Sequence, residues 1–202
     1  MRSDGCLLSG FTSTVVIAVV YVLCHGLTAW VFSPIQSYFL SEITIFASLV
    51  YLPHGVRVLS TWLIGARAII PLILGAVASE LIFTQPQTWE RMQHILWLSL
   101  VVSAVSAYVA FRLMHVFGAS VWNCNRRRMN WRQLLVVGLL ASVVNSVGQT
   151  VAFSGVIAPN LLLGVVVTYA AGDMIGQCVA MFVLMMIFRA LRLRQQPKRL
   201  ET

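Results

Sequence analysis

Long apolar runs restrict the fold of this chain more than any other feature of its sequence. They lie at residues 11–32, 43–83, 95–114, 134–157 and 161–188. An α-helix needs about 20 residues to cross a bilayer, and the second run is about twice that length. We expect it to turn once, at Gly65–Ala66–Arg67, and to form helices at 43–64 and 67–83. The sequence thus predicts an all-α polytopic transmembrane bundle of about six helices, with residues 1–202 forming one integral membrane domain.

Composition supports a membrane environment. Hydrophobic residues make up 59% of the 202 residues and charged residues only 10%. Soluble domains contain about 45–50% apolar and 25% charged residues. A soluble core of this size could not cover so much apolar surface. This composition excludes a soluble enzyme and a disordered chain.

The basic residues predict the orientation in the membrane. The formal net charge is +8. With six helices, nearly all basic residues lie on the side of the two termini, including the short tail at 189–202. Cytoplasmic loops of membrane proteins carry the excess of Lys and Arg. We therefore expect an inner-membrane protein with both termini in the cytoplasm.

Four arginines form the densest basic cluster of a loop, namely Arg126, Arg127, Arg128 and Arg132. The simpler interpretation is an anchor at anionic lipid headgroups. The alternative is a docking site for an acidic cytoplasmic protein. Because the positive charge is accounted for by topology, we expect no nucleic acid partner.

Polar side chains at membrane depth are the candidates for a binding site, because each costs free energy unless it is paired or hydrated. They are His54, Arg57, Glu80, Asn145, Gln149 and Asp173. At about 1.5 Å of rise per residue, Arg57 and Asp173 fall in one layer, so we expect them to pair. That pair is either a tether between helices or part of a ligand or ion site. Asn145 and Gln149, one turn apart, are expected to bond a neighbouring helix or a ligand.

Two groups of small or helix-breaking residues accompany these polar positions. Pro53 and Gly55 predict a bent or broken helix, because a proline in mid-helix removes a backbone hydrogen bond. Gly172 and Gly176 have the GxxxG spacing that lets two helices approach closely. We expect this pair to seat the last helix against a neighbour and to hold Asp173 inward.

Catalysis and metal binding are not expected. A serine or cysteine nucleophile needs a base within hydrogen-bond reach, and no such pair is evident. The four histidines lie on separate segments, the cysteines have no CxxC spacing, and no nucleotide-binding motif occurs. The sequence therefore predicts no enzyme and no metal site, and it leaves any cofactor unknown.

Two motifs resemble a known family. Residues 53–75 have the pattern P-x-G-x9-G-x-R-x3-P-x3-G, and residues 172–176 read G-D-M-I-G. Together they resemble the MASE1 integral membrane sensory domain. The resemblance implies that one functional centre contains Pro53, Gly55, Arg57, Gly172, Asp173 and Gly176. Members of that family have about eight helices and a fused cytoplasmic output domain, so the output of this chain would require a separate partner.

Three functions remain open at this point. The first is a MASE1-like sensory module that detects a small ligand or a membrane state and acts through a protein partner. The second is a small-solute transporter, or the substrate-capture subunit of an uptake system, with a site near Glu42, Glu80 and Gln149. The third is a non-catalytic scaffold subunit of a membrane complex.

Overall fold

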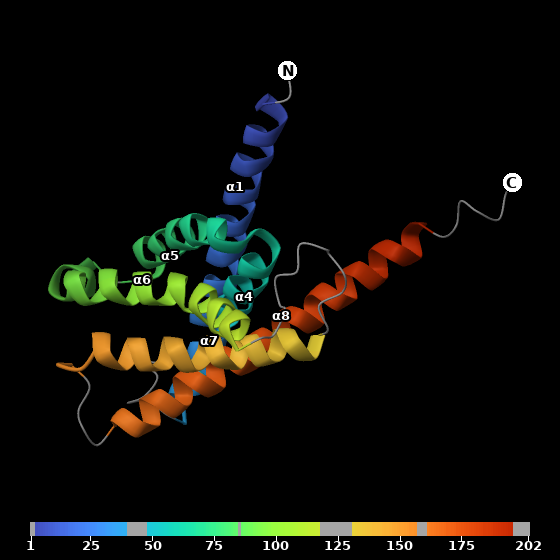
Figure 1. Ribbon diagram of the computed structural model, residues 1–202. Coiled ribbons are helices and arrows are strands. Elements are labelled where there is room, and N and C mark those ends of the chain that lie inside the picture. The colour runs from blue at the N-terminus through green and yellow to red at the C-terminus, as the bar shows by residue number, and fades with distance from the viewer. Residues whose placement is uncertain (1–2, 40–47, 85, 118–130, 157–160, 196–202) are drawn as a thin grey trace, which may run out of the picture.

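A computed structural model describes residues 3–39, 48–84, 86–117, 131–156 and 161–195 (Figure 1). The fold class is all-helical, and no strand occurs within these ranges. The elements are α1 (Ser3–Leu27), the π-helix η1 (Thr28–Phe32), α2 (Ser33–Ser37), α4 (Leu52–Ile64), the 3-10 helix η2 (Gly65–Ala68), α5 (Ile69–Phe83), α6 (Pro86–Val116), α7 (Trp131–Ala152) and α8 (Leu162–Gln195).

Five described segments are long and apolar enough to cross a membrane. They are Gly10–Ser37, Leu52–Phe83, Glu90–Val116, Trp131–Ala152 and Leu162–Arg192. The expected count of six is not confirmed, because α4 and α5 together form one 32-residue segment. With 13 and 15 residues, each is only about 20 Å long, shorter than the roughly 30 Å hydrocarbon core of a bilayer.

Contacts with α1 show that α4 and α5 run in opposite directions. Tyr21 of α1 lies beside Arg57, and Thr28, which follows α1 as the first residue of η1, lies beside Leu52, so α4 is antiparallel to α1. Gly75 packs on Tyr21 and Phe83 on Gly26, so α5 is parallel to α1. The chain reverses at Gly65, whose φ of 64° suits a residue without a Cβ. Figure 1 shows this change of direction between α4 and α5.

The helix expected at 43–64 begins only at Leu52. Residues 40–47, including Glu42, lie outside the described part of the chain, and Ser48–Tyr51 is irregular. Pro53 therefore occupies the first turn of α4 rather than its middle. Of the two forms expected, a bent or a broken helix, the described residues show no bend at Pro53 but an irregular segment directly before the helix. Proline is favoured in the first turn because the N–H groups there have no partner within the helix.

Neighbouring elements satisfy the backbone of the irregular segment Ser48–Tyr51 and of the residue after it. The Leu49 N–H donates to Gln36 Oε1 at 2.6 Å, and the Tyr51 N–H donates to the Gly172 carbonyl at 3.0 Å. The Leu52 N–H donates to Thr28 Oγ1 at 3.3 Å. Non-helical backbone at membrane depth is tolerated only where protein or water covers it. The segment thus separates α4 from the chain before it while lying against the middle of α8.

The remaining helices differ from expectation mainly at their ends. The helices expected at 95–114 and 134–157 span 86–116 and 131–152, and non-helical angles at Met92 interrupt α6. The helix expected at 161–188 continues to Gln195, so the first half of the expected tail is helical. Residues 189–195 consist of Arg, Leu, Ala and Gln, which are strong helix formers.

The distribution of side chains is that of a multi-pass membrane protein. Large apolar residues face outward, as Trp30 and Leu163 do at 74% and 75% exposure. Arg57 and Asp173 are each only 1% exposed. A soluble fold buries its apolar side chains and rarely its charges. A lipid bilayer is therefore the environment that this surface fits.

Candidate ligand-binding cavity

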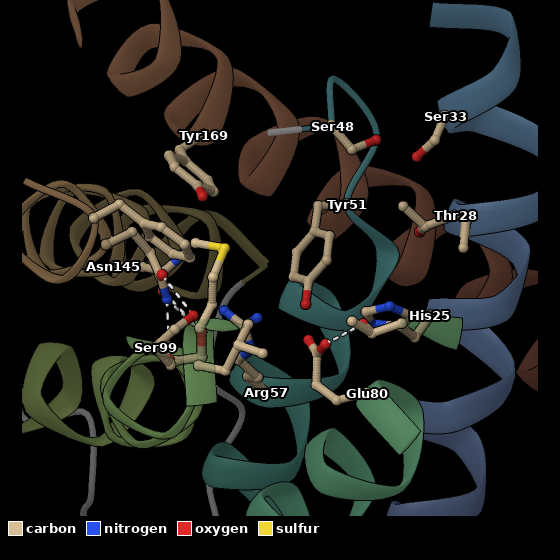
Figure 2. Close-up of a pocket in the computed structure, with 17 residues that line it drawn as sticks. His25, Thr28, Ser33, Ser48, Tyr51, Arg57, Glu80, Ser99, Asn145 and Tyr169 are labelled. Carbon is tan, nitrogen blue, oxygen red and sulfur yellow. Dashed lines mark hydrogen bonds between the residues drawn. The ribbon is translucent and has the colours of Figure 1, made fainter. Parts of the chain in front are cut away.

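A cavity of about 380 Å³ lies inside the bundle (Figure 2). All the major helices and the segment Ser48–Tyr51 contribute to its wall. The polar lining residues labelled in Figure 2 are His25, Thr28, Ser33, Ser48, Tyr51, Arg57, Glu80, Ser99, Asn145 and Tyr169. Pockets of this size fit small molecules rather than polymers.

The cavity lies toward the helix ends opposite to most of the exposed arginines, although the exposed Arg91 of α6 lies on the cavity side. Its wall includes Thr84, just after α5, Met92 in the first turns of α6, and Phe153, just after α7. Exposed arginines mark the other ends of the same helices: Arg67 before α5, Arg112 near the end of α6 and Arg132 at the start of α7. The bundle thus has one basic end and one end that contains the cavity.

Arg57 is the most unusual group in the cavity wall. It projects from the second turn of α4 and is 1% exposed. Its Nη2 donates to the Tyr21 hydroxyl at 3.4 Å, a long hydrogen bond, and its Cζ lies 4.9 Å from the centre of the Tyr51 ring. Nε and Nη1 have no hydrogen-bond partner among the described residues. Cation–π contacts stabilise this charge in part, but the three N–H groups on Nε and Nη1 lack an acceptor among the described residues.

The expected Arg57–Asp173 ion pair does not form. Asp173 Oδ2 instead lies 3.2 Å from His54 Nδ1 and accepts a hydrogen bond from Asn145 Nδ2 at 2.8 Å. His54, one turn before Arg57 on α4, occupies the position beside the carboxylate. The depth estimated from chain position places His54 and Arg57 in the same layer as Asp173. It does not show which of the two side chains on α4 points at the Asp173 carboxylate.

The pair of His54 and Asp173 is fully enclosed. His54 Nε2 donates to the Gly138 carbonyl at 3.2 Å, because a carbonyl oxygen can only accept. His54 Nδ1 lies 3.2 Å from Asp173 Oδ2, within ion-pair distance, but it makes no hydrogen bond among the described residues. The pair joins α4 to α8, and Asn145 extends the connection to α7.

A ladder of hydrogen bonds joins α7 to α6. Ser99 Oγ donates to Gln149 Oε1 at 2.7 Å, and Gln149 Nε2 donates to Ser103 Oγ at 2.8 Å. Ser103 Oγ also donates to Asn145 Oδ1, at 3.4 Å. Asn145 and Gln149 therefore bond a neighbouring helix, and both also reach the cavity wall. We call His54, Asp173, Asn145, Gln149, Ser99 and Ser103 the interhelical network.

Small residues allow α8 to pack against the start of α4. A Cβ at Gly172 would overlap the backbone oxygen of Ser48, and one at Gly176 would overlap that of Tyr51. A Cβ at Gly55 would overlap the side chain of Ala180. The neighbour of the GxxxG pair is thus an irregular segment and not a second straight helix. This close approach positions Tyr51 beside Arg57.

Glu80 brings a carboxylate to the cavity wall from α5. It is half-buried, and the Thr84 hydroxyl donates to its Oε2. No ion pair joins it to a basic group in the described ranges. Figure 2 shows Glu80 and Arg57 directed toward the same region of the cavity, near the Tyr51 hydroxyl. The cavity therefore contains one cationic and one anionic side chain that do not neutralise each other directly.

Several site residues were missed by the sequence reasoning. Tyr21 and Tyr51 flank Arg57, and Thr28, Ser99 and Ser103 contribute hydroxyl groups to the wall or the network. Within apolar runs such residues have no spacing that separates them from ordinary packing residues. A π-helix at Thr28–Phe32 carries one of them, and such irregularities are frequent at functional sites.

Only one arginine of the basic loop cluster lies within the described residues. Arg126, Arg127 and Arg128 lie outside the described residues, whereas Arg132 is exposed, with its Cζ 5.4 Å from the Trp131 ring centre.

Among the described residues, no group of three or more His, Cys, Asp or Glu side chains could hold a metal ion.

Comparisons with known proteins find no matching family model, no matching curated protein and no matching solved structure. The resemblance to the MASE1 domain therefore stays a prediction. The function has to be argued from the cavity itself.

Proposed function

We propose that this protein binds a small water-soluble solute within its bundle and captures it for transport across the membrane. The observation that carries the proposal is Arg57, a buried cation with unpaired N–H groups in the wall of a polar cavity. Burial of a charge is costly unless a partner compensates it. A bound solute supplies that partner.

The irregular backbone beside the cavity supports the same function. In many transporters, discontinuous helices place helix ends and free backbone groups at the substrate site. Here η1 interrupts the first spanning segment, and Ser48–Tyr51 precedes the start of α4. Thr28 and Tyr51, one from each interruption, both line the cavity.

The orientation follows from the charge distribution. The exposed arginines at one end of the bundle correspond to the cytoplasmic excess of basic residues. We therefore propose that this end, with both termini, lies on the cytoplasmic side of the inner membrane. The cavity end then faces outward, where a solute to be taken up is encountered.

A sensory module is the second candidate, favoured by the shape of α8. This helix carries Asp173 in the interhelical network and continues beyond the bundle to Gln195 with Arg189 and Arg192 exposed (Figure 1). A ligand that shifts α8 would displace this basic end, where an acidic protein partner could respond. Such a module requires two arrangements of α8 that the ligand stabilises unequally.

Thermal unfolding of the purified full chain in lipid nanodiscs tests the proposal. The probes are amino acids, organic acids, sugars and water-soluble vitamins, each as a concentration series. A bound solute raises the unfolding midpoint by mass action. We expect at least one class to do so in the wild type and in the control Arg112→Gln, but not in Arg57→Gln. No shift with any class would overturn the proposal and favour a scaffold. Uptake into proteoliposomes then separates a transporter from a sensor.

A further inference from the structure

We propose that the solute is a small zwitterion of the amino acid class, with its carboxylate on Arg57 and its ammonium group on Glu80. This inference rests on the proposed function and adds the chemical class of the solute. It depends on the two charged side chains that the cavity wall brings together from α4 and α5.

The unpaired face of Arg57 defines the first half of the ligand. Nε and Nη1 have no partner among the described residues, and Nη2, which shares an edge of the planar guanidinium with each of them, uses one of its two N–H groups on Tyr21. A carboxylate accepts two parallel N–H bonds from such an edge. The rings of Tyr21 and Tyr51 lie beside the guanidinium, with its Cζ 6.0 Å and 4.9 Å from their centres. The ligand therefore carries a carboxylate.

Glu80 defines the second half. Its carboxylate lies on the same cavity and receives a hydrogen bond from Thr84. A dicarboxylate would place a second negative charge against Glu80, and a simple amine would place its positive charge near Arg57. Like charges brought together in this way disfavour the wrong ligand. A molecule with one charge of each sign matches both side chains.

The size and the walls of the cavity agree with this class. A volume of about 380 Å³ lies near the lower end of the range for small-molecule pockets. Leu96, Phe153 and Tyr169 contribute apolar or aromatic surface beside the polar groups. An amino acid presents an apolar or weakly polar side chain to such a wall.

Equilibrium binding to the full chain in nanodiscs tests the inference with matched probes. The standard L-amino acids are measured first. For leucine and phenylalanine, 4-methylpentanoate and 3-phenylpropanoate lack the ammonium group, whereas 3-methylbutylamine and phenethylamine lack the carboxylate. Hydrogen bonds to charged groups contribute about 1.5–3 kcal/mol, which corresponds to roughly 10–100-fold in affinity. We expect the amino acid to bind more tightly than either analogue by that factor.

Variants assign the two ends of the ligand. Arg57→Gln is expected to weaken amino acid binding by roughly 10–100-fold, and Arg57→Lys, which keeps the charge but not the fork, by less. Glu80→Gln is expected to weaken the amino acid and to leave the ammonium-free acid unchanged or improved. The matched controls are Arg112→Gln and Glu90→Gln, at exposed positions. A circular dichroism spectrum like that of the wild type verifies the fold of each variant.

Three results would overturn the inference. Equal affinity for the amino acid and its ammonium-free analogue would show that Glu80 does not bind an ammonium group of the ligand. Binding of sugars or other uncharged solutes only, with loss in Arg57→Gln, refutes the zwitterion but leaves the proposed function intact. Binding of no solute of any class refutes both.

Discussion

The interhelical network and Arg57 both place polar groups inside the bundle, and they differ in how many hydrogen bonds those groups make. In the interhelical network, Asp173 contacts both His54 and Asn145, and Gln149 bonds two serines of α6. Arg57 in the cavity wall has one long hydrogen bond and two nitrogens without a partner among the described residues. Both sets are buried, so exposure alone does not distinguish them.

We interpret this difference as separating residues that hold the fold from a residue that we propose binds a ligand. The network makes specific contacts between α4, α6, α7 and α8 and loses them if one member is removed. An unsatisfied cation contributes little to the ligand-free fold and gains its partner on binding.

Removal of the carboxylate from the network is expected to have the largest effect. Asp173→Ala leaves Asn145 Nδ2 without its acceptor and removes the carboxylate 3.2 Å from His54 Nδ1, in a site that is 1% exposed. Breaking a buried charged pair by removing one partner costs about 3–5 kcal/mol. Denaturant unfolding in mild detergent measures the loss. Asp173→Asn, which keeps an acceptor oxygen, should lose less, and equal stability of the alanine variant and the wild type would contradict the network's role.

The packing of α8 against Tyr51 is the next target. Gly176→Ala introduces a Cβ that overlaps the Tyr51 backbone oxygen. This oxygen can move aside only if the whole segment Ser48–Tyr51 moves. Overpacking of this kind costs about 1–3 kcal/mol. The same unfolding assay applies, with Gly10→Ala as the control because a Cβ there meets nothing within 4 Å. If both variants unfold at the same denaturant concentration, the close approach of α8 is not required.

Loss of a single member of the ladder between α6 and α7 is expected to have a smaller effect. Gln149→Leu removes the hydrogen bonds to Ser99 and Ser103 but keeps most of the side-chain volume. Interhelical hydrogen bonds in membrane proteins contribute about 0.6 kcal/mol on average and up to about 1.7 kcal/mol. A double-mutant cycle with Ser103→Ala measures the coupling. A coupling energy of zero would remove Gln149 from the network.

The sequence predicted the class of fold and most of the polar layer, because both depend on residue type and chain position. Apolar runs of sufficient length indicate spanning helices, and Gly65 suits the reversal that separates α4 from α5. Charged and amide side chains inside those runs are unusual whatever their partners are. His54, Arg57, Asn145 and Asp173 therefore stand out without a structure.

The partners within that layer could not be predicted, because they depend on the rotation of each helix and on where it starts. Residues 43–51 read as apolar helix, yet Ser48–Tyr51 is irregular, and Gly172 of α8 and Gln36 bond its backbone. Tyr51 then turns toward Arg57, and His54 takes the position beside Asp173 that depth alone assigned to Arg57. Contacts between distant segments decide these details.

The most direct test of the account is the unfolding free energy of Arg57→Met, measured in nanodiscs without added solute beside Asp173→Ala. Methionine removes the unpaired buried charge and retains an unbranched apolar side chain. Since replacement of buried charges by apolar groups is often neutral or stabilising, we predict that Arg57→Met is at least as stable as the wild type. Asp173→Ala should be several kcal/mol less stable, as expected for a broken buried pair. A loss of stability in Arg57→Met equal to that in Asp173→Ala would show that Arg57 also holds the fold, and would contradict its assignment to ligand binding.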